Sequence, residues 1–179
     1  MRGFAAPWWI VGGWAIDLFV GRETRPHSDV DVVVRRADQG LLRERFGSWD
    51  VQVAHAGKLE PWVGQLEPPH NGLWARRDPG GPWELQFILA QHDGDDWLYR
   101  HDDSIRMPLA QAVLHDERGI PFARPEIVLL SKSRLLRHQD TRDLEAALPL
   151  LDEASRERLL AWLPADHAWR ARLGTAGAR

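Results

Sequence analysis

Two aspartates, Asp29 and Asp31, stand one residue apart in the valine-rich segment DVDVVVR at residues 29–35. β-Branched residues favour a strand, and residues two apart on a strand project to the same face, with Cα atoms about 6.5–7 Å apart. Both carboxylates are therefore expected on one side, and Val30, Val32 and Val34 in the core. Like charges this close raise each other's pKa, and a hard cation such as Mg²⁺ relieves the repulsion. Solvated acids on an edge strand give the same pattern, so the motif alone leaves both interpretations open.

Residues suited to phosphate precede the aspartates. Gly12 and Gly13 stand before an apolar helical pattern, and backbone N–H groups at the start of a helix attract anions. Arg22 and Arg25 can form charge-assisted hydrogen bonds with phosphate oxygens. A simple chain turn is the alternative role for the two glycines.

Residues 9–34 resemble the signature of the polymerase-β-type nucleotidyltransferase superfamily, especially the aminoglycoside and lincosamide nucleotidyltransferases of antibiotic resistance. In that group a Gly-Gly turn precedes a helix, and a Gly-Arg-x-Thr-Arg-x-His stretch leads into an Asp-x-Asp strand. The matching residues here are Gly12, Gly13, Gly21, Arg22, Thr24, Arg25, His27, Asp29 and Asp31. Looser matches at residues 83–86, 97–100, 125–126 and 132–143 extend the resemblance over most of the chain.

This resemblance implies a set of roles. Asp29 and Asp31 would ligate Mg²⁺, with two ions expected, and Gly12 and Gly13 would contact the phosphates of a nucleoside triphosphate, for which ATP is the expected substrate. Lys132 would reach the triphosphate. For His27 and Ser28 we expect structural roles in orienting or capping the loop before the strand.

The position of a third carboxylate is open. The resembling enzymes place one on a neighbouring strand, as a metal ligand or as a general base for the acceptor hydroxyl. The segment WELQFIL at residues 83–89 predicts that strand, with Glu84, Gln86 and Ile88 on the face opposite Trp83 and its apolar neighbours. We assign the third site to Glu84, the only acid on this strand. If Gln86 stands there instead, an amide weakens metal binding and removes the base.

Hydrophobic periodicity predicts the elements that position these residues. The fold class expected is α+β, with a small mixed-sheet nucleotidyltransferase core at residues 1–106, flanking helices, and a helical subdomain at 107–179. Strands are predicted at residues 29–35, 50–53, 73–76, 83–89 and 119–123, a surface loop at 91–96, and a loose tail at 174–179. Helices are predicted at residues 14–19, 37–46, 108–114, from Pro125 with Leu135 and Leu136 buried, at 144–151 and at 154–163.

Composition narrows the function classes. The net charge is −3 and no basic stripe is visible, so no nucleic-acid partner is expected. With no cysteines, thiolate metal sites are excluded, and we expect a cytoplasmic setting. No apolar run approaches the ~18 residues that a membrane span needs, so no membrane partner is expected.

Other acidic clusters are weaker candidates. Asp93, Asp95 and Asp96 resemble a fragment of a calcium loop but lack its glutamate at position 12, so a solvated turn is expected. Together with Asp102 and Asp103, the last two could line a site for a cationic acceptor. Asp140 and Asp143 stand one helical turn apart. They could face a ligand or be exposed charges on a helix surface, and the sequence leaves both interpretations equally open.

The sequence thus favours an Mg²⁺-dependent nucleotidyltransferase that moves AMP from ATP onto a hydroxyl of a small molecule, such as an aminoglycoside- or lincosamide-like antibiotic. Two alternatives stay open: a nucleotidyltransferase-fold component of a toxin–antitoxin pair acting on a partner protein, and an inactive nucleotide-binding relative. The acceptor, the base preference and the oligomeric state do not follow from the sequence.

Overall fold

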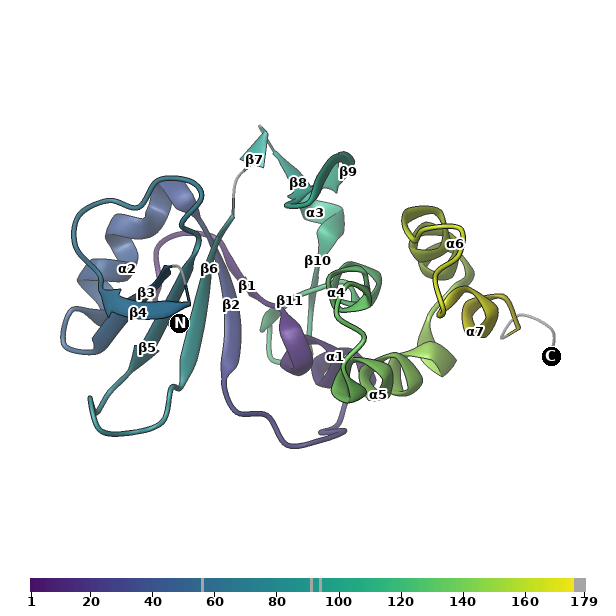
Figure 1. Ribbon diagram of the computed structural model, residues 1–179, viewed down its shortest axis with the longest axis horizontal. Coiled ribbons are helices and arrows are strands. Elements are labelled where there is room, and N and C mark those ends of the chain that lie inside the picture. The colour runs from purple at the N-terminus through teal and green to yellow at the C-terminus, as the bar shows by residue number, and fades with distance from the viewer. Residues whose placement is uncertain (56, 91, 94, 176–179) are drawn as a thin grey trace.

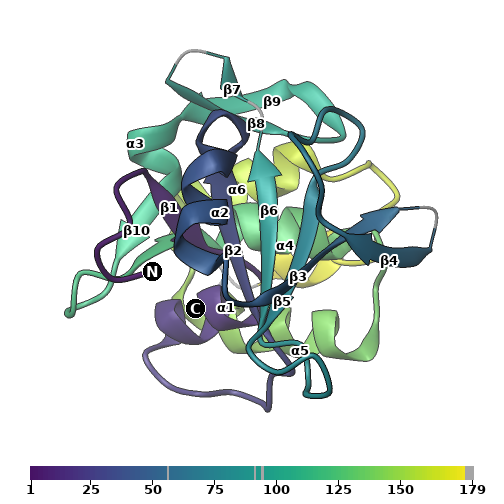
Figure 2. The same cartoon turned by 90° about the vertical axis from the view of Figure 1, so that its left-hand side faces the viewer.

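The computed structural model describes residues 1–55, 57–90, 92–93 and 95–175, which form a mixed β-sheet with helices on both sides (Figure 1). Helix α2 (Gln39–Phe46) covers one face, while α1 (Gly12–Val20), α4 (Pro125–Ser133) and α5 (His138–Ala147) lie on the other. In the view turned by 90°, α2 stands in front of the strands and α4 and α5 stand behind them (Figure 2). The predicted α+β class with a mixed sheet is confirmed.

The main sheet of the described chain has eight strands in the order β10-β11-β1-β2-β6-β5-β3-β4. Strands β2 and β6 are parallel, as are β1 and β11, and the other neighbours are antiparallel. Because β10 and β11 belong to it, the sheet extends beyond residues 1–106, to which the core was assigned from sequence. The bounds are Trp8–Ile10 for β1, Val30–Arg35 for β2, Asp50–His55 for β3, Lys58–Pro61 for β4, Gly72–Arg76 for β5, Leu85–Ala90 for β6, Val113–His115 for β10 and Pro121–Ala123 for β11.

Strand β2 separates two hydrophobic cores. Val32 and Val34 pack with Leu42 and Phe46 in the core under α2, and both valines are almost fully buried. Val33 points the other way, into the core shared with the helical half. Since side chains alternate along a strand, the side chain of residue 31 faces the helical half as well.

The helical half is built around one leucine-rich core. Ile16 of α1, Leu129 of α4, Leu144 of α5 and Leu159 of α6 are all fully buried in it. Burial of each such side chain contributes about 1.5–3 kcal/mol. The remaining helices are α3 (Leu109–Ala112), α6 (Glu153–Trp162) and α7 (Arg170–Thr175). No helix in the described part of the chain has the length and apolar character needed to cross a membrane.

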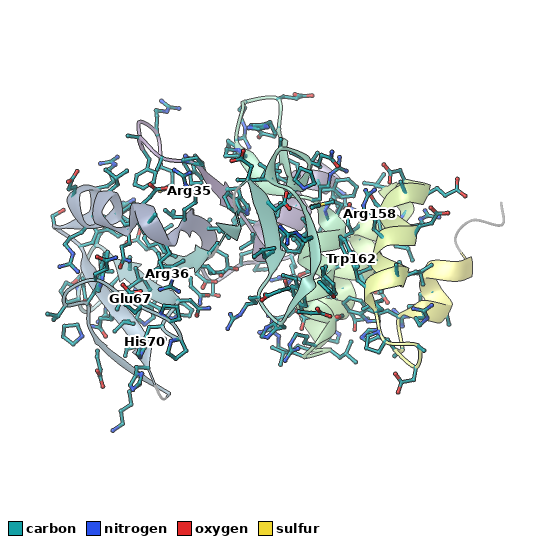
Figure 3. All side chains as sticks on the ribbon, turned by 90° about the horizontal axis from the view of Figure 1, so that it is seen from above. Arg35, Arg36, Glu67, His70, Arg158 and Trp162 are labelled. Carbon is teal, nitrogen blue, oxygen red and sulfur yellow. The ribbon has the colours of Figure 1, made fainter. Side chains whose placement is uncertain are left out.

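Buried arginine contacts fix the two ends of the molecule, which Figure 3 shows far apart. At the α2 end, Nη1 of Arg36 donates to the carbonyl oxygens of Leu66 at 3.0 Å and His70 at 2.7 Å. At the helical end, Arg158 of α6 donates to Oε1 of the fully buried Glu126 of α4 at 2.7 Å. This ion pair ties α6 to α4 and keeps the helical half in place.

The surface loop predicted at residues 91–96 is wrong where the structure describes it. Strands β7 (His92–Asp93), β8 (Asp96–Tyr99) and β9 (Asp102–Pro108) form a second, three-stranded antiparallel sheet. Residues 91 and 94 lie outside the described part of the chain. Tyr99 and Met107 of this sheet are buried in the core shared with the helical half, and the polar residues 91–96 do not indicate this contact.

The long helix predicted from Pro125 is interrupted, and Leu135 and Leu136 are exposed rather than buried, at 67% and 44%. Helix α4 ends at Ser133, and Leu136 takes a left-handed conformation at φ 49°. A carboxylate oxygen of Asp140 accepts the backbone N–H of Arg137 at 3.0 Å, which caps the start of α5. The cap begins a second helix and so breaks the apolar period.

Three further expectations from sequence differ from the structure. Trp83 precedes β6 and contacts Trp74 and Arg76 rather than sharing a face with Leu85. The helix predicted at residues 108–114 is the single turn α3 followed by β10. The loose tail was predicted to begin at Gly174, but Gly174 and Thr175 belong to α7. Residues 176–179 lie outside the described chain.

Candidate functional site

The loop between α1 and β2 is held to α1 by a buried aspartate. Asp17 is 4% exposed, and it accepts hydrogen bonds from the backbone N–H of Thr24 at 3.1 Å and from its hydroxyl at 2.5 Å. Its second oxygen lies 2.5 Å from Nε2 of His27. These contacts fix residues 24–27 just before the aspartate pair, and they give His27 the structural role expected for it.

Gly12 and Gly13 do more than turn the chain. Gly12 has φ +68°, and a Cβ atom placed on it would lie 1.9 Å from Oδ2 of Asp31. A Cβ on Gly13 would collide with the side chains of Arg25 and His27. Only residues without side chains allow the first turn of α1 to approach β2 this closely.

Asp29 and Asp31 are both half-buried at the entry to β2. Burial and the charge of Asp29 raise the pKa of the Asp31 carboxyl to about 6, against the opposing influence of Lys132 and other nearby cations. Ser28 donates its hydroxyl to Asp29 at 2.8 Å. Two close carboxylates, one with a raised pKa, form a donor set that a hard divalent cation stabilises, so Asp29 and Asp31 fit Mg²⁺.

Lys132 and Arg25, both expected at the triphosphate, are bound to the same carboxylate in the structure. Nζ of Lys132 lies 2.7 Å from Oδ2 of Asp143 and 3.3 Å from Oδ1 of Asp140. Arg25 donates Nε and Nη2 to Asp143 at 2.7 and 3.0 Å. Asp140 and Asp143 are fully buried, so they are not exposed helix charges. Phosphate contact by either cation stays a prediction.

Glu84 and Gln86 occupy different places relative to the aspartates. The parallel pairing of β2 with β6 sets Gln86 directly beside Asp31. Glu84 precedes β6, and its carboxylate accepts the backbone N–H of Arg77 at 3.1 Å and lies 3.5 Å from Nε of that arginine. No three metal-ligating side chains come together anywhere in the described residues. The amide of Gln86 thus lies beside Asp31, while the carboxylate of Glu84 is bound to Arg77. The backbone of Glu84 also lies beside the start of β2, because the N–H of Val30 donates to its carbonyl oxygen at 3.0 Å, so the assignment of the third carboxylate to Glu84 stays a prediction.

The other acidic candidates lie away from the pair, in the second sheet. Asp96 is bound to Arg106 at 2.8 Å, and Asp102 accepts the hydroxyl of Ser104 at 2.6 Å. Asp103 is exposed. Nothing in these contacts points to a shared ligand.

Known proteins resemble this chain in part of its sequence and in its fold. The family model of aminoglycoside-2''-adenylyltransferases matches residues 1–55, and the 2''-aminoglycoside nucleotidyltransferase of Escherichia coli is 35% identical over 72 residues. The solved structure of ANT(2'')-Ia in complex with adenylyl-2''-tobramycin superposes with a TM-score of 0.59 at 18% identity, covering 93% of this chain and 88% of that one. The chain has the nucleotidyltransferase fold.

The lincomycin-bound lincosamide adenylyltransferase LnuA is a second neighbour with the nucleotidyltransferase fold, with a TM-score of 0.58 and 16% identity over 81% of this chain and 87% of that chain. The resemblance to aminoglycoside and lincosamide nucleotidyltransferases noted from residues 9–34 is thus confirmed. The match with the Escherichia coli protein spans 38% of this chain and 41% of that protein's length. The family model's match at residues 1–55 includes the glycines, the loop and the aspartates.

Two residues of this nucleotidyltransferase fold escaped the sequence reasoning. Asp17 received no role from the sequence, although an acid within WAIDLFV is a signal for a buried partner. Arg137 binds Asp140 at 2.9 Å and lies close enough to Asp31 to oppose the rise of its pKa. No local pattern marked Arg137, because its partners are set by the break between α4 and α5.

Proposed function

We propose that this chain is an Mg²⁺-dependent nucleotidyltransferase that moves AMP from ATP onto a hydroxyl group of a small molecule. The observation that carries the proposal is the contact of Gly12 with Asp31. It sets the N-terminus of α1, which no side chain caps, directly beside Asp31 of β2. A triphosphate bound to the backbone N–H groups of this N-terminus would have its phosphorus atoms next to the carboxylate pair.

In the reaction, the acceptor oxygen bonds to the α-phosphorus while the bond from that phosphorus to the bridging oxygen breaks. Pyrophosphate leaves with the electron pair, and the hydroxyl proton passes to water. Mg²⁺ ions held by Asp29 and Asp31, two of them by analogy with the resembling enzymes, would supply charge neutralisation on the phosphates. The chain's own contribution is to hold the phosphates against Gly12 and Gly13 in fixed orientation.

Roles for the cations follow from their positions. Lys132 and Arg137 lie near enough to Asp31 to oppose the rise of its pKa, which supports a role for both in binding a phosphate beside it. Nη2 of Arg25 lies beside Gly13 while the side chain binds Asp143, which supports a phosphate contact, and the exposed Arg22 would act from the loop. The relatives' names point to antibiotic acceptors such as tobramycin and lincomycin, and a small hydroxylated acceptor in the cytoplasm is part of this proposal.

One observation favours a second candidate, a protein that binds the nucleotide without transferring it. Gln86 pairs with Asp31 across the sheet, so an amide occupies one of the two positions considered for a third carboxylate. An amide neither carries the charge to hold a second cation well nor accepts a proton from the acceptor.

An acceptor screen with labelled ATP and Mg²⁺, read by pyrophosphate release and label transfer, tests the proposal. Asp29→Asn and Asp31→Asn should each abolish transfer, and near-normal turnover in either variant would refute the mechanism. Calorimetry separates the second candidate, for which Mg²⁺-dependent ATP binding occurs without turnover on any acceptor.

A further inference from the structure

A continuous row of side chains leads across the sheet away from the aspartates. Asp31 of β2 pairs with Gln86 of β6, Gln86 pairs with Trp74 of β5, and Trp74 pairs with Gln52 of β3. Paired residues of adjacent strands project to the same face. All four side chains therefore share the face that carries the proposed metal site.

A cavity of about 310 Å³ lies at the outer end of this row. Its size is within the range of small-molecule pockets. Trp74 of β5 and Trp83, which shortly precedes β6, meet there with ring centroids 6.2 Å apart and planes at 63°. Its lining consists of Ala54, Gly57, Lys58, Leu59, Trp74 and Trp83.

Polar contacts hold this aromatic wall in one orientation. The guanidinium of Arg76 lies 4.1 Å from the ring centroid of Trp83. Asp50 fixes Arg76 through a 2.7 Å ion pair and also accepts a hydrogen bond from Gln52 at 2.9 Å. An aromatic surface supported in this way loses little conformational entropy when a ligand covers it.

The charges around the cavity do not suit a polycation. Among the described residues that line it, Lys58 alone is charged. Two carboxylates near it are engaged, Asp50 with Arg76 and Glu84 with Arg77. Glu60, next to Leu59, pairs with Val53 and so belongs to the opposite face of the sheet. An ammonium group entering the cavity would therefore lose hydration without gaining a free carboxylate.

The cavity also lies on the side from which an acceptor must approach. The phosphates are expected on the α1 side of Asp31, beside Gly12, and the sheet continues on the other side through β6 and β5 toward its outer edge (Figure 1). In-line displacement requires the attacking hydroxyl opposite the leaving pyrophosphate. Trp74 is two strands from Asp31, a separation of about 10 Å at the usual strand spacing.

We propose that this cavity binds the acceptor, and that the acceptor is an uncharged hydroxylated ring compound rather than a polycationic aminoglycoside. One ring lies against Trp74 and Trp83, and a hydroxyl about 10 Å away reaches the phosphate beside Asp31. This inference rests on the function proposed above, and it names the acceptor class for the same site.

The test is a titration of protein labelled with ¹⁵N in its tryptophan indoles, with each signal assigned by a single Trp→Phe variant. The neutral probe is 4-nitrophenyl β-D-glucopyranoside, and the polycationic probe is tobramycin. We expect the glucoside to shift the Trp74 and Trp83 signals in a saturable manner, and tobramycin to leave both unchanged. Silence toward the glucoside, or a response of these two indoles to tobramycin, overturns the inference.

A pair of variants measures how much the Trp74 ring contributes to ligand affinity. Trp74→Ala should weaken glucoside binding about two- to tenfold, because the ligand ring loses an aromatic contact. Trp162→Ala is the matched control, because Trp162 pairs with Trp97 at a similar 6.3 Å but lies at the helical end of the molecule (Figure 3). Equal affinity in the two variants contradicts the assignment.

Calorimetry with Mg²⁺ and ATP on the wild-type protein separates the two proposals. If ATP binds and the indoles stay silent toward the glucoside, only the acceptor inference fails. If the indoles respond but ATP does not bind, the proposed function fails and the acceptor assignment fails with it.

Discussion

Replacing Gly12 by alanine tests whether the approach of α1 to Asp31 organises the site. The new Cβ would lie 1.9 Å from Oδ2 of Asp31, whereas ordinary contacts begin at 3.4 Å. Either the carboxylate or the start of the helix must therefore move by about 1.5 Å, the difference between these two distances. A displacement of about 1 Å at reacting groups can lower a rate about 100-fold.

The substitution also strains the backbone, because Gly12 has a positive φ angle. The variant Gly21→Ala measures this strain separately. Gly21 has φ +79° and no atom within 4 Å of a Cβ placed on it, so Gly21→Ala introduces the same left-handed strain without a collision. That strain is about 1–2 kcal/mol, which lowers Tm by about 2–8 °C in a domain of this size. Both variants should show this loss of stability.

The assay compares the two variants in pyrophosphate release and in Mg²⁺-dependent ATP binding, with thermal unfolding measured alongside. We expect Gly12→Ala to lose at least about 100-fold in kcat/KM, and Gly21→Ala to retain activity at temperatures where it is folded. If Gly12→Ala remains as active as Gly21→Ala, the close approach of α1 to β2 is not what orders the site.

Three further outcomes follow from the same contacts. Asp143→Asn weakens the ion pairs of that carboxylate with Arg25 and Lys132, and should lower the free energy of unfolding in urea by about 3–5 kcal/mol. Glu145→Gln, in an exposed pair with Arg172, should change that free energy by less than about 0.5 kcal/mol. Burial acts to raise the pKa of Asp143, but its hydrogen bonds and ion pairs with Arg25 and Lys132 outweigh burial and lower it. The stability that Asp143 contributes should be fully present above the unfolded pKa of 3.8 and lost as pH falls through the lower folded pKa. The stabilities of the wild type and of Asp143→Asn should therefore converge in acid. Gln86→Glu places a third carboxylate beside Asp31 and should lower the Mg²⁺ concentration needed for half-maximal ATP binding. Gln52→Glu, on the same face but two strands farther from Asp31, should leave that concentration unchanged. Equal Mg²⁺ dependence in the two variants would show that the position beside Asp31 is not part of the metal site.

Local sequence patterns predicted the parts of this fold that depend on neighbouring residues. The alternation of valines with Asp29 and Asp31 indicated a strand with one apolar face, and Val32 and Val34 are buried as expected. Such patterns succeed because the period of a strand is set by the backbone itself.

The remainder depended on contacts distant in sequence. Arg25 and Asp143 are 118 residues apart, and nothing local to either residue indicates that they pair. The position of Gln86 beside Asp31 follows from strand register, and a shift of one residue would have exchanged the face it occupies. Leu135 and Leu136 fit the apolar period of α4, but the capping of α5 by Asp140 ends that helix before them.

The charge balance at the site argues that nucleotide binding depends strongly on magnesium. Three cations, Arg25, Lys132 and Arg137, face the buried anions Asp140 and Asp143, which leaves a surplus of one positive charge. A triphosphate brings several negative charges next to Asp29 and Asp31, and repulsion between anions in a partly buried site is strong. The missing positive charge must come from divalent ions held by those two aspartates. Removing them with a chelator should therefore abolish ATP binding in calorimetry, and ATP binding of equal strength with and without Mg²⁺ would show that the protein's cations suffice.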